Sequence, residues 1–347
     1  MPVKVHQRRT ELFRENTREG VDAKQSAGIL KAKNTIVQII EEDFIMPGGK
    51  PIRLENHQRR ILNTWFRPTN GKLPYHTLVY STVKKSGKTE VAAMVMYAWA
   101  KTYGGDIYSI ANDKTQAEER AYRRVEEMFK RMRKYDPDRF KEEVHPDHHK
   151  VIAKQTREGN EQIVLNNGAR IIAIPCDPYG EAGGMQTLTV FDELWAYRSE
   201  LAARLWVEMQ PLPRGVGNVT ESARLVVTYA GWYGESELLW NIYEDICKPD
   251  ENGEEQGSRV KGLDDLPVYE SGDNVAYWDH VGRMPWHTPE FLEQARNDPA
   301  LKGRKSEYLR IWENRWTTGI EPYINMEDYD RLVAKGKANG LYNRFVV

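Results

Sequence analysis

LVYSTVKKSGKTEVAAMVMYAWA, residues 78–100, has the pattern of a buried strand, a polar loop and an apolar helix. The strand is predicted at residues 78–80, the loop at 82–86 and the helix at 90–100. Gly87-Lys88-Thr89 stands between the loop and the helix. In a phosphate-binding loop (P-loop), backbone N–H groups and the positive end of the following helix surround the phosphates. The Lys then reaches the β- and γ-phosphates, and the Thr hydroxyl holds Mg²⁺.

The phosphate-loop motif is incomplete in this chain. The full pattern G-x-x-x-x-G-K-[ST] requires Gly at position 82, where the chain has Thr82. Average composition places Gly-Lys-Thr by chance in roughly one chain of this length in six. A Gly-containing loop before a core helix therefore stays open on this segment alone, and the rest of the chain has to decide.

Length and composition limit the possible number of domains and the classes of protein to which the chain could belong. The 347 residues allow one large domain or two ordinary ones with a sizeable core. The 50 Lys and Arg nearly balance the 51 Asp and Glu, which argues neither for nor against nucleic-acid binding. Cys176 and Cys247 lie far apart, which suggests a reducing compartment and no zinc site. Because no apolar run has the length of a membrane span or a signal peptide, we expect a soluble intracellular protein.

Helices are predicted before the loop. Residues 1–34 are polar and are expected to form an exposed arm or a loosely packed helix. Apolar positions at helical spacing predict a helix over residues 36–44 and an Asn-capped helix within residues 51–66. Gln58 lies in the first turns of the second helix. Its amide has the donor and acceptor that complement an adenine edge, whereas a surface glutamine on an amphipathic helix is the alternative.

Strands and helices alternate after the loop, which is typical of an open α/β sheet. We predict a strand at 106–111, a charged helix at 112–134, an Asn-Gly hairpin at 163–174 and a mobile Gly-rich loop at 177–184. The outer face of the charged helix is basic. It is either a solvated surface with pairs such as Glu126 with Lys130, or a surface that follows DNA.

A second candidate site ends the segment TLTVFDE, residues 187–193. A buried strand that ends in Asp192-Glu193 would place one carboxylate near Mg²⁺ and the next where it deprotonates a water that attacks the γ-phosphate. Alternatively, the two acids only favour the N-terminus of a helix predicted over 194–209. Together with the loop upstream, they indicate an ATPase. A further strand is predicted at 223–231 and contains Thr228. Its hydroxyl could respond to hydrolysis of the γ-phosphate, or Thr228 could be an ordinary strand residue whose side chain suits a β-sheet.

The order of these motifs resembles the ATPase domain of the large terminase subunit of tailed bacteriophages. The resemblance rests on Leu54-x-x-His57-Gln58, residues 86–89, the Asn-Gly hairpin, residues 190–193 and residues 227–231. Residues 308–316, YLRIWENRW, are similar to the family segment that leads out of the ATPase region. The resemblance covers roughly residues 50–330.

The resemblance implies an α/β P-loop NTPase fold of the additional-strand, catalytic-glutamate (ASCE) type, with a mainly parallel central sheet flanked by helices. We expect an N-terminal arm and helix at 1–50, the ATPase core at 51–247, and an acidic loop with a small C-terminal linker or lid subdomain at 248–347. Residues 248–275 are expected to form a long surface loop. Trp278, Trp286 and Trp312 are expected to pack the subdomain on the core. No nuclease activity is expected from this chain, although family members continue into a nuclease domain.

The resemblance also implies a function. We expect a motor in the host cytoplasm that hydrolyses ATP with Mg²⁺ to drive double-stranded DNA into a procapsid. Its expected partners are double-stranded DNA, the portal protein, the small terminase subunit and further copies of itself. The copies are expected to form a homo-oligomeric ring, a pentamer when assembled, with a monomer as the alternative for the isolated chain. The resemblance assigns roles to residues by position. Gln58 would contact adenine, and phosphate would be bound by Lys85, Ser86, Gly87 and Lys88. Mg²⁺ would be held by Thr89 and Asp192, Glu193 would be the catalytic base, and Thr228 would couple hydrolysis to movement.

Departures from the family pattern leave alternatives open. Family members often have an Arg in the phosphate loop, whereas this chain has Lys84 and Lys85, which lack the planar guanidinium. The catalytic cation is therefore Lys84 in cis or an arginine elsewhere. A helicase-like or other remodelling ATPase, and an assembly module that binds ATP with weak hydrolysis, are also compatible with the sequence.

Overall fold

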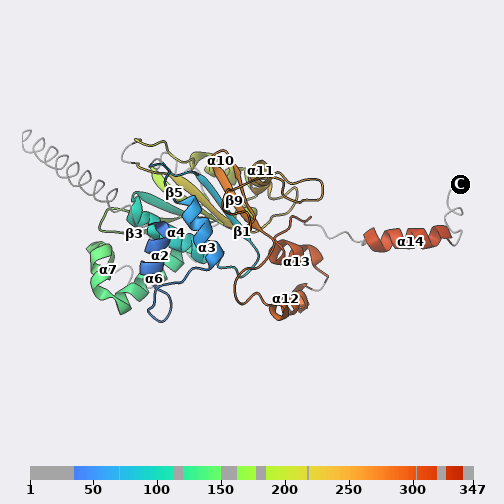
Figure 1. Cartoon of the computed structure of the whole chain (residues 1–347), viewed down its shortest axis with the longest axis horizontal. Coiled ribbons are helices and arrows are strands. Elements are labelled where there is room, and N and C mark those ends of the chain that lie inside the picture. The colour runs from blue at the N-terminus through green and yellow to red at the C-terminus, as the bar shows by residue number, and fades with distance from the viewer. Residues whose placement is uncertain are drawn as a thin grey trace, which may run out of the picture.

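A nine-stranded sheet organises the chain, which we describe from a computed structural model (Figure 1). The structure describes residues 35–69, 71–111, 120–149, 162–176, 185–216, 219–301, 303–318 and 326–338. The strand order is β3-β4-β2-β5-β6-β1-β9-β8-β7. The strands from β4 to β9 in this order are parallel, and antiparallel pairs add β3 at one end and β8 and β7 at the other. The predicted mainly parallel sheet is confirmed.

The strands are β1 (Thr77–Thr82), β2 (Asp106–Ala111), β3 (Gln162–Val164), β4 (Arg170–Pro175), β5 (Gln186–Asp192), β6 (Ala223–Thr228), β7 (Ser258–Arg259), β8 (Val268–Ser271) and β9 (Asn274–Asp279). The α-helices are α2 (Ile36–Asp43), α3 (Asn56–Trp65), α4 (Lys88–Thr102), α6 (Ala121–Tyr135), α7 (Pro137–Glu143), α10 (Glu200–Glu208), α11 (Glu237–Cys247), α12 (Pro289–Arg296), α13 (Lys305–Trp312) and α14 (Met326–Ala338). Short 3₁₀ helices are η1 (Pro146–His148), η2 (Leu194–Ala196) and η3 (Pro299–Leu301).

Helices cover both faces of the sheet. α2, α3, α4 and α6 lie on one face and α10 and α11 on the other, so that two apolar layers form (Figure 1). α4 is buried along its whole apolar length, from Val91 to Ala100. It packs against the sheet on one side and against α2 and α6 on the other. A helix enclosed in this way is apolar all round, which explains why its sequence has no polar face.

Several predicted secondary-structure elements within the described residues are confirmed. β2 has the predicted bounds, and the Asn-Gly hairpin forms β3 and β4. On α6, Val125, Met128 and Met132 are buried, and Glu126 pairs with Lys130 at 2.9 Å. Further ion pairs of this kind favour a solvated outer face. The predictions for residues 1–34, 112–119 and 177–184 lie outside the described residues.

Two predicted helices differ from the structure. Glu55 rather than Asn56 caps α3, in a capping box in which Gln58 Oε1 accepts the Glu55 N–H at 3.1 Å. The single helix predicted over 194–209 is instead divided into η2 and α10. The division occurs because the Ser199 hydroxyl accepts the Ala202 N–H and starts a new helix.

The prediction of a long surface loop at 248–275 is wrong. β7, β8 and β9 extend the sheet, and β9 pairs in parallel with β1 from Thr77↔Asn274 to Thr82↔Asp279. Trp278 is fully buried in β9, with its ring 4.3 Å from that of Tyr243, so it belongs to the core and not to a lid. Acidic residues in the turns concealed these short strands. The sheet therefore continues beyond the predicted core boundary at 247.

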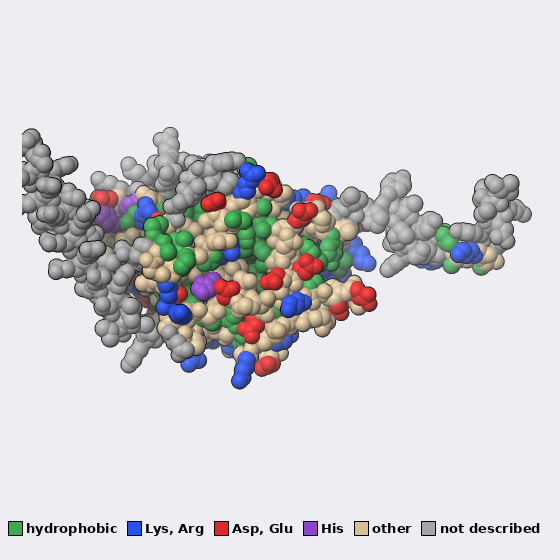
Figure 2. Space-filling view, turned by 90° about the horizontal axis from the view of Figure 1, so that it is seen from above, with side chains coloured by type: hydrophobic (Ala, Val, Ile, Leu, Met, Phe, Trp, Pro, Cys, Tyr) green, Lys and Arg blue, Asp and Glu red, His purple; other side chains and the backbone are tan. Residues whose placement is uncertain are grey.

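The surface mixes both charges. Figure 2 shows basic and acidic side chains interspersed over one face, in keeping with the net charge of −1. Within the described ranges, none of the helices combines the length and the apolar character that crossing a membrane requires.

Candidate nucleotide-binding site

Three strands bring the predicted motif residues to one edge of the sheet. β6 lies between β1 and β5, and all three are parallel. Their carboxyl ends therefore meet at the same edge, where ligands of open α/β sheets bind. The loop before Lys88, the Asp192-Glu193 pair and Thr228 follow or end these strands. The strand inserted between the other two is the additional strand that the predicted fold class requires.

The loop presents Lys88 at the start of α4. Gly87 caps the helix at φ 72°, a left-handed conformation that glycine adopts without strain. Lys88 Nζ donates to the carbonyls of Thr82 (2.9 Å) and Val83 (3.2 Å) and lies 4.6 Å from the ring centroid of Tyr229. Burial lowers the pKa of Lys88 to about 8, although the charges of the two neighbouring acids oppose this. The ammonium thus sits at a positive helix end, which suits an anion.

Thr89 and Asp192 form the part of the site that fits a divalent cation. The Thr89 hydroxyl lies 3.5 Å from Asp192 Oδ2. Asp192 Oδ1 and the Ser86 hydroxyl are buried and have no hydrogen-bond partner among the described residues. Burial, and then the charge of Glu193, raise the pKa of Asp192. A cation would offset both costs, and hydroxyl and carboxylate oxygens are the ligands that Mg²⁺ prefers.

Glu193 is held in an unusual backbone conformation. Its φ of 61° lies in the left-handed region, which costs about 1–3 kcal/mol for a residue other than glycine. Its N–H donates to the Val227 carbonyl at 2.8 Å, so the turn is anchored to β6. The Trp195 indole N–H donates to Glu193 Oε2 at 2.6 Å. The carboxylate is therefore oriented by a hydrogen bond from two residues further along the chain.

Thr228 ties the end of β6 to the segment after Glu193. It is fully buried, and its hydroxyl donates to the Tyr229 carbonyl at 2.9 Å and accepts the Trp195 N–H at 3.4 Å. The structure thus places Thr228 beside the acid pair. Its predicted coupling role stays a prediction.

The segment before α12 and helix α13 contact the phosphate loop through hydrogen bonds to its backbone. The Trp286 indole donates to the Lys85 carbonyl at 2.9 Å, and His287 Nε2 lies 3.0 Å from the Lys84 carbonyl. The Lys84 N–H donates to the Ile311 carbonyl at 2.6 Å. The Lys84 ammonium lies 5.9 Å from the ring centroid of Trp312. Trp286 and Trp312 therefore pack the C-terminal segment on the core, as the sequence predicted.

Gln58 stands apart from the other predicted residues. It is 4% exposed in α3, and its amide oxygen accepts the Glu55 N–H. None of the described contacts joins it to the phosphate loop or to the acid pair. Its adenine contact stays a prediction.

Sequence reasoning missed several residues around the site. Arg120 lies close enough to lower the pKa of Asp192. Trp195, Tyr229 and Arg310 pack together beside Glu193. Arg310 lies far along the chain from Trp195, so no local pattern connects them.

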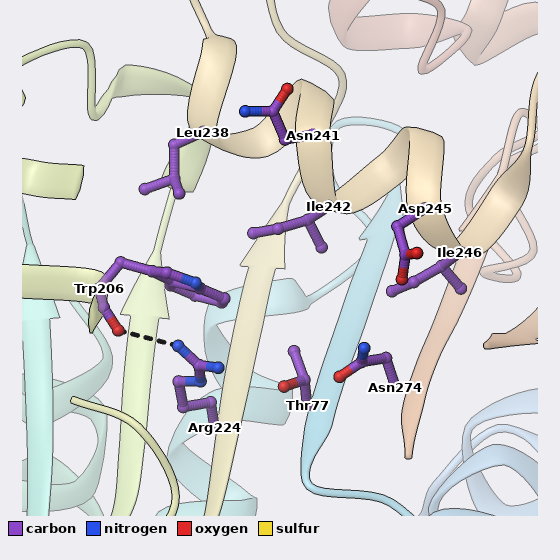
Figure 3. A pocket seen from close by; sticks show the side chains of 9 residues that line it. All are labelled: Thr77, Trp206, Arg224, Leu238, Asn241, Ile242, Asp245, Ile246 and Asn274. Carbon is purple, nitrogen blue, oxygen red and sulfur yellow. Dashed lines mark hydrogen bonds between the residues drawn. The ribbon is translucent and has the colours of Figure 1, made fainter. Parts of the chain in front are cut away.

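A pocket of about 240 Å³ lies at the opposite edge of the sheet (Figure 3). Thr77 and Asn274 begin β1 and β9, and α11 covers them with apolar and polar side chains. Arg224 stacks 3.9 Å from the ring centroid of Trp206 and donates to its carbonyl at 2.9 Å. Because the motif residues lie at the other ends of the strands, this pocket is separate from the candidate nucleotide site.

Comparison with solved structures addresses the fold. The crystal structure of the HK97 bacteriophage large terminase is similar with a TM-score of 0.52 and 16% identity, over 86% of this chain and 58% of that chain. The present chain shares its fold with a large terminase. The terminase ATPase domain of Thermus phage P74-26 is also similar, at 15% identity and a TM-score of 0.44, over 76% of this chain and 94% of that chain. No model of a known protein family matches the chain, and no curated protein does.

Proposed function

We propose that the chain is the ATPase motor of a viral terminase, which hydrolyses ATP to move double-stranded DNA into a procapsid. One observation carries the proposal: residues from three separate segments converge at the carboxyl edge of β1, β5 and β6. They are Lys88 and Thr89 from the first segment, Asp192 and Glu193 from the second, and Thr228 from the third. The fold shared with the HK97 large terminase supports the packaging role. The chain spans 58% of that protein's length.

Each residue has a distinct role in the proposed reaction. Lys88 and the N-terminus of α4 bind the β- and γ-phosphates. With a pKa of about 8, the lysine is mostly protonated at neutral pH, and a bound phosphate favours that charge. Thr89 and Asp192 would hold Mg²⁺, which neutralises phosphate charge when bound. Glu193 accepts the proton of the attacking water.

Motor action requires partners in this proposal. Double-stranded DNA is the substrate that is moved, and the portal protein, the small terminase subunit and other copies of the chain form the machine around it. Lys84 is the proposed catalytic cation in cis, because it lies in the phosphate loop and makes none of the ion pairs found among the described residues. Gln58 is the proposed adenine contact.

Steady-state ATP hydrolysis by the purified chain tests the proposal. Lys88→Ala should lower kcat/KM at least about 100-fold, since it removes the cation that binds phosphate. Lys141→Ala, an exposed lysine of α7, is the matched control and should hydrolyse ATP at the wild-type rate. Linear duplex DNA should stimulate the wild type, and a rate that rises more than linearly with protein concentration indicates assembly.

Glu193→Gln separates hydrolysis from binding. It should retain ATP and lower kcat about 10²–10⁴-fold, because the amide cannot accept the proton. If Glu193→Gln hydrolyses ATP at the wild-type rate, Glu193 is not the catalytic base. If the wild type shows no Lys88-dependent hydrolysis under any condition, the assembly-module function replaces the motor.

A further inference from the structure

A buried arginine and three aromatic rings lie behind the Asp192-Glu193 turn. The Arg310 guanidinium carbon is 4.0 Å from the ring centroid of Trp195, 4.9 Å from that of Tyr229 and 4.7 Å from that of Trp232. The Trp195 and Tyr229 rings are stacked, with centroids 5.9 Å apart and an interplanar angle of 20°. We refer to Trp195, Tyr229, Trp232 and Arg310 as the arginine cage.

Arg310 is fixed within the cage. It is 2% exposed, and Glu307 accepts hydrogen bonds from its Nη2 at 2.8 Å and its Nε at 3.3 Å. Its Nη1 donates to the Ala230 carbonyl at 3.4 Å. A planar guanidinium can stack on rings while its edge bonds a carboxylate, which a lysine cannot do. Arg310 therefore holds the Trp195 ring in one place.

Trp195 is also fixed through its own backbone. Its N–H donates to the Thr228 hydroxyl at 3.4 Å, and its carbonyl accepts the Ser236 hydroxyl at 2.7 Å. With ring and backbone both held, the indole N–H points at Glu193 Oε2 at 2.6 Å. An indole N–H only donates, so it orients the carboxylate without competing for a proton. This arrangement leaves Glu193 Oε1 to accept one.

We propose that Trp195 is a positioning residue that orients the Glu193 carboxylate, and that Arg310 holds Trp195 for this purpose. The inference rests on the proposed function, in which Glu193 deprotonates water. In that step the water oxygen bonds to the γ-phosphorus while the bond to the β–γ bridging oxygen breaks. The bond electrons leave with ADP, and the proton passes to Glu193 Oε1. A base oriented by a third group is the general form of such sites.

The cage also connects the base to the phosphate loop. Arg310 and Ile311 are neighbours in α13. Arg310 holds the ring that bonds Glu193, and the Ile311 carbonyl accepts the Lys84 N–H. One turn of α13 thus contacts both halves of the candidate site.

Trp195→Phe in the full chain tests the inference, because phenylalanine keeps a stacking ring and removes the N–H. We expect kcat to fall about 10- to 100-fold, as misoriented catalytic groups typically cause. KM for ATP should stay within about twofold of wild type, because Trp195 does not bind the nucleotide. Trp240→Phe is the matched control, since its ring packs on Tyr233, Tyr243 and Trp316 and not on the cage. It should leave kcat unchanged.

Two further variants separate positioning from general destabilisation. In a Glu193→Gln background, Trp195→Phe should lower the residual single-turnover rate no further, because the group it orients is already lost. Arg310→Lys keeps the charge but loses the planar stack, and it should lower kcat in the same direction as Trp195→Phe.

The assays distinguish failure of the inference from failure of the proposed function. If Lys88 and Glu193 are both required for turnover while Trp195→Phe keeps the wild-type kcat, the inference alone is overturned. It is overturned equally if Trp195→Phe lowers kcat and ATP binding in parallel, or lowers the residual rate of Glu193→Gln. A wild type without Lys88-dependent hydrolysis overturns both.

Discussion

His280, the residue after β9, forms a half-buried ion pair with Glu255. His280 Nε2 lies 3.0 Å from Glu255 Oε1, and the Tyr243 hydroxyl donates to the same carboxylate oxygen at 2.8 Å. Burial by itself would lower the pKa of His280, but the hydrogen bond and charge of Glu255 raise it above its ordinary value. Burial would likewise raise the pKa of Glu255, but His280 and Tyr243 lower it. The folded state thus favours the charged forms of both residues.

The pair predicts a pH dependence of stability. Because its folded pKa is raised, His280 contributes fully below its unfolded pKa of about 6.5, and the contribution is lost as pH rises through the folded pKa. Glu255 contributes above about pH 4.3 and loses its contribution as pH falls through its lowered pKa. We expect wild type to lose its stability advantage over His280→Gln as pH rises from about 6.5, by about 1.4 kcal/mol for each unit of pKa shift.

Urea unfolding of both proteins at a series of pH values measures this difference. The other histidines are common to both, so the difference between the two curves reports the His280–Glu255 pair, and its change above about pH 6.5 reports the titration of His280. Parallel curves across the whole range would contradict the prediction.

At the scale of elements, the segment before α12 restrains the phosphate loop. The carbonyls of Lys84 and Lys85 are bonded by His287 and Trp286, and Lys85 has a positive φ of 67°. His287 Nδ1 accepts the Met284 N–H at 3.3 Å, so the neutral ring donates from Nε2 to Lys84. Burial lowers the pKa of His287, which favours this neutral form. Two residues far along the chain thus hold a loop conformation that local sequence alone disfavours.

Loss of these contacts should loosen the loop. In the double variant Trp286→Phe/His287→Ala, we expect faster amide exchange over residues 83–87 and a KM for ATP raised by up to about 30-fold, since about 1 kcal/mol is lost with each of the two hydrogen bonds. Hydrogen-exchange mass spectrometry and steady-state kinetics measure the two effects. Trp286→Phe alone keeps the ring and is the milder control. Exchange at the wild-type rate in the double variant would show that the loop holds its own shape.

At the scale of the whole molecule, the C-terminal strands complete the sheet. All residues of β1 are buried, and β9 covers one edge of β1 along its length. Without β9, the edge of this buried strand would expose unpaired backbone groups, which favours aggregation. The sheet therefore depends on residues beyond 247.

Truncation tests this dependence. A fragment of residues 35–247 should be insoluble or should unfold without a cooperative transition, because β1 lacks its partner. A fragment of residues 35–318 retains β9 and α13 and should unfold cooperatively near the temperature of the full chain. Circular dichroism during heating measures both. A soluble, cooperatively unfolding 35–247 fragment would contradict the prediction.

Elements with local sequence signals could be predicted without the structure. The buried run before Lys88, the Asn-Gly turn between β3 and β4 and the run that ends in Asp192-Glu193 each depend on side chains a few residues apart. Periodicity and turn chemistry act over that range. Because strands and helices alternate along the chain, the strands are parallel and their carboxyl ends lie at the same edge of the sheet. The loop and the acid pair are therefore expected at that edge.

Contacts between segments that are distant in the chain become visible only in the folded protein. The pairing of β9 with β1, and the contact of Arg310 with Trp195, join residues far apart in the chain. Such contacts follow from strand order and from how helices pack on the sheet, and neither leaves a periodic pattern in the sequence. A short strand among acidic turns therefore resembled a loop, and a tryptophan after Asp192-Glu193-Leu194 gave no sign that it orients the carboxylate two residues before it.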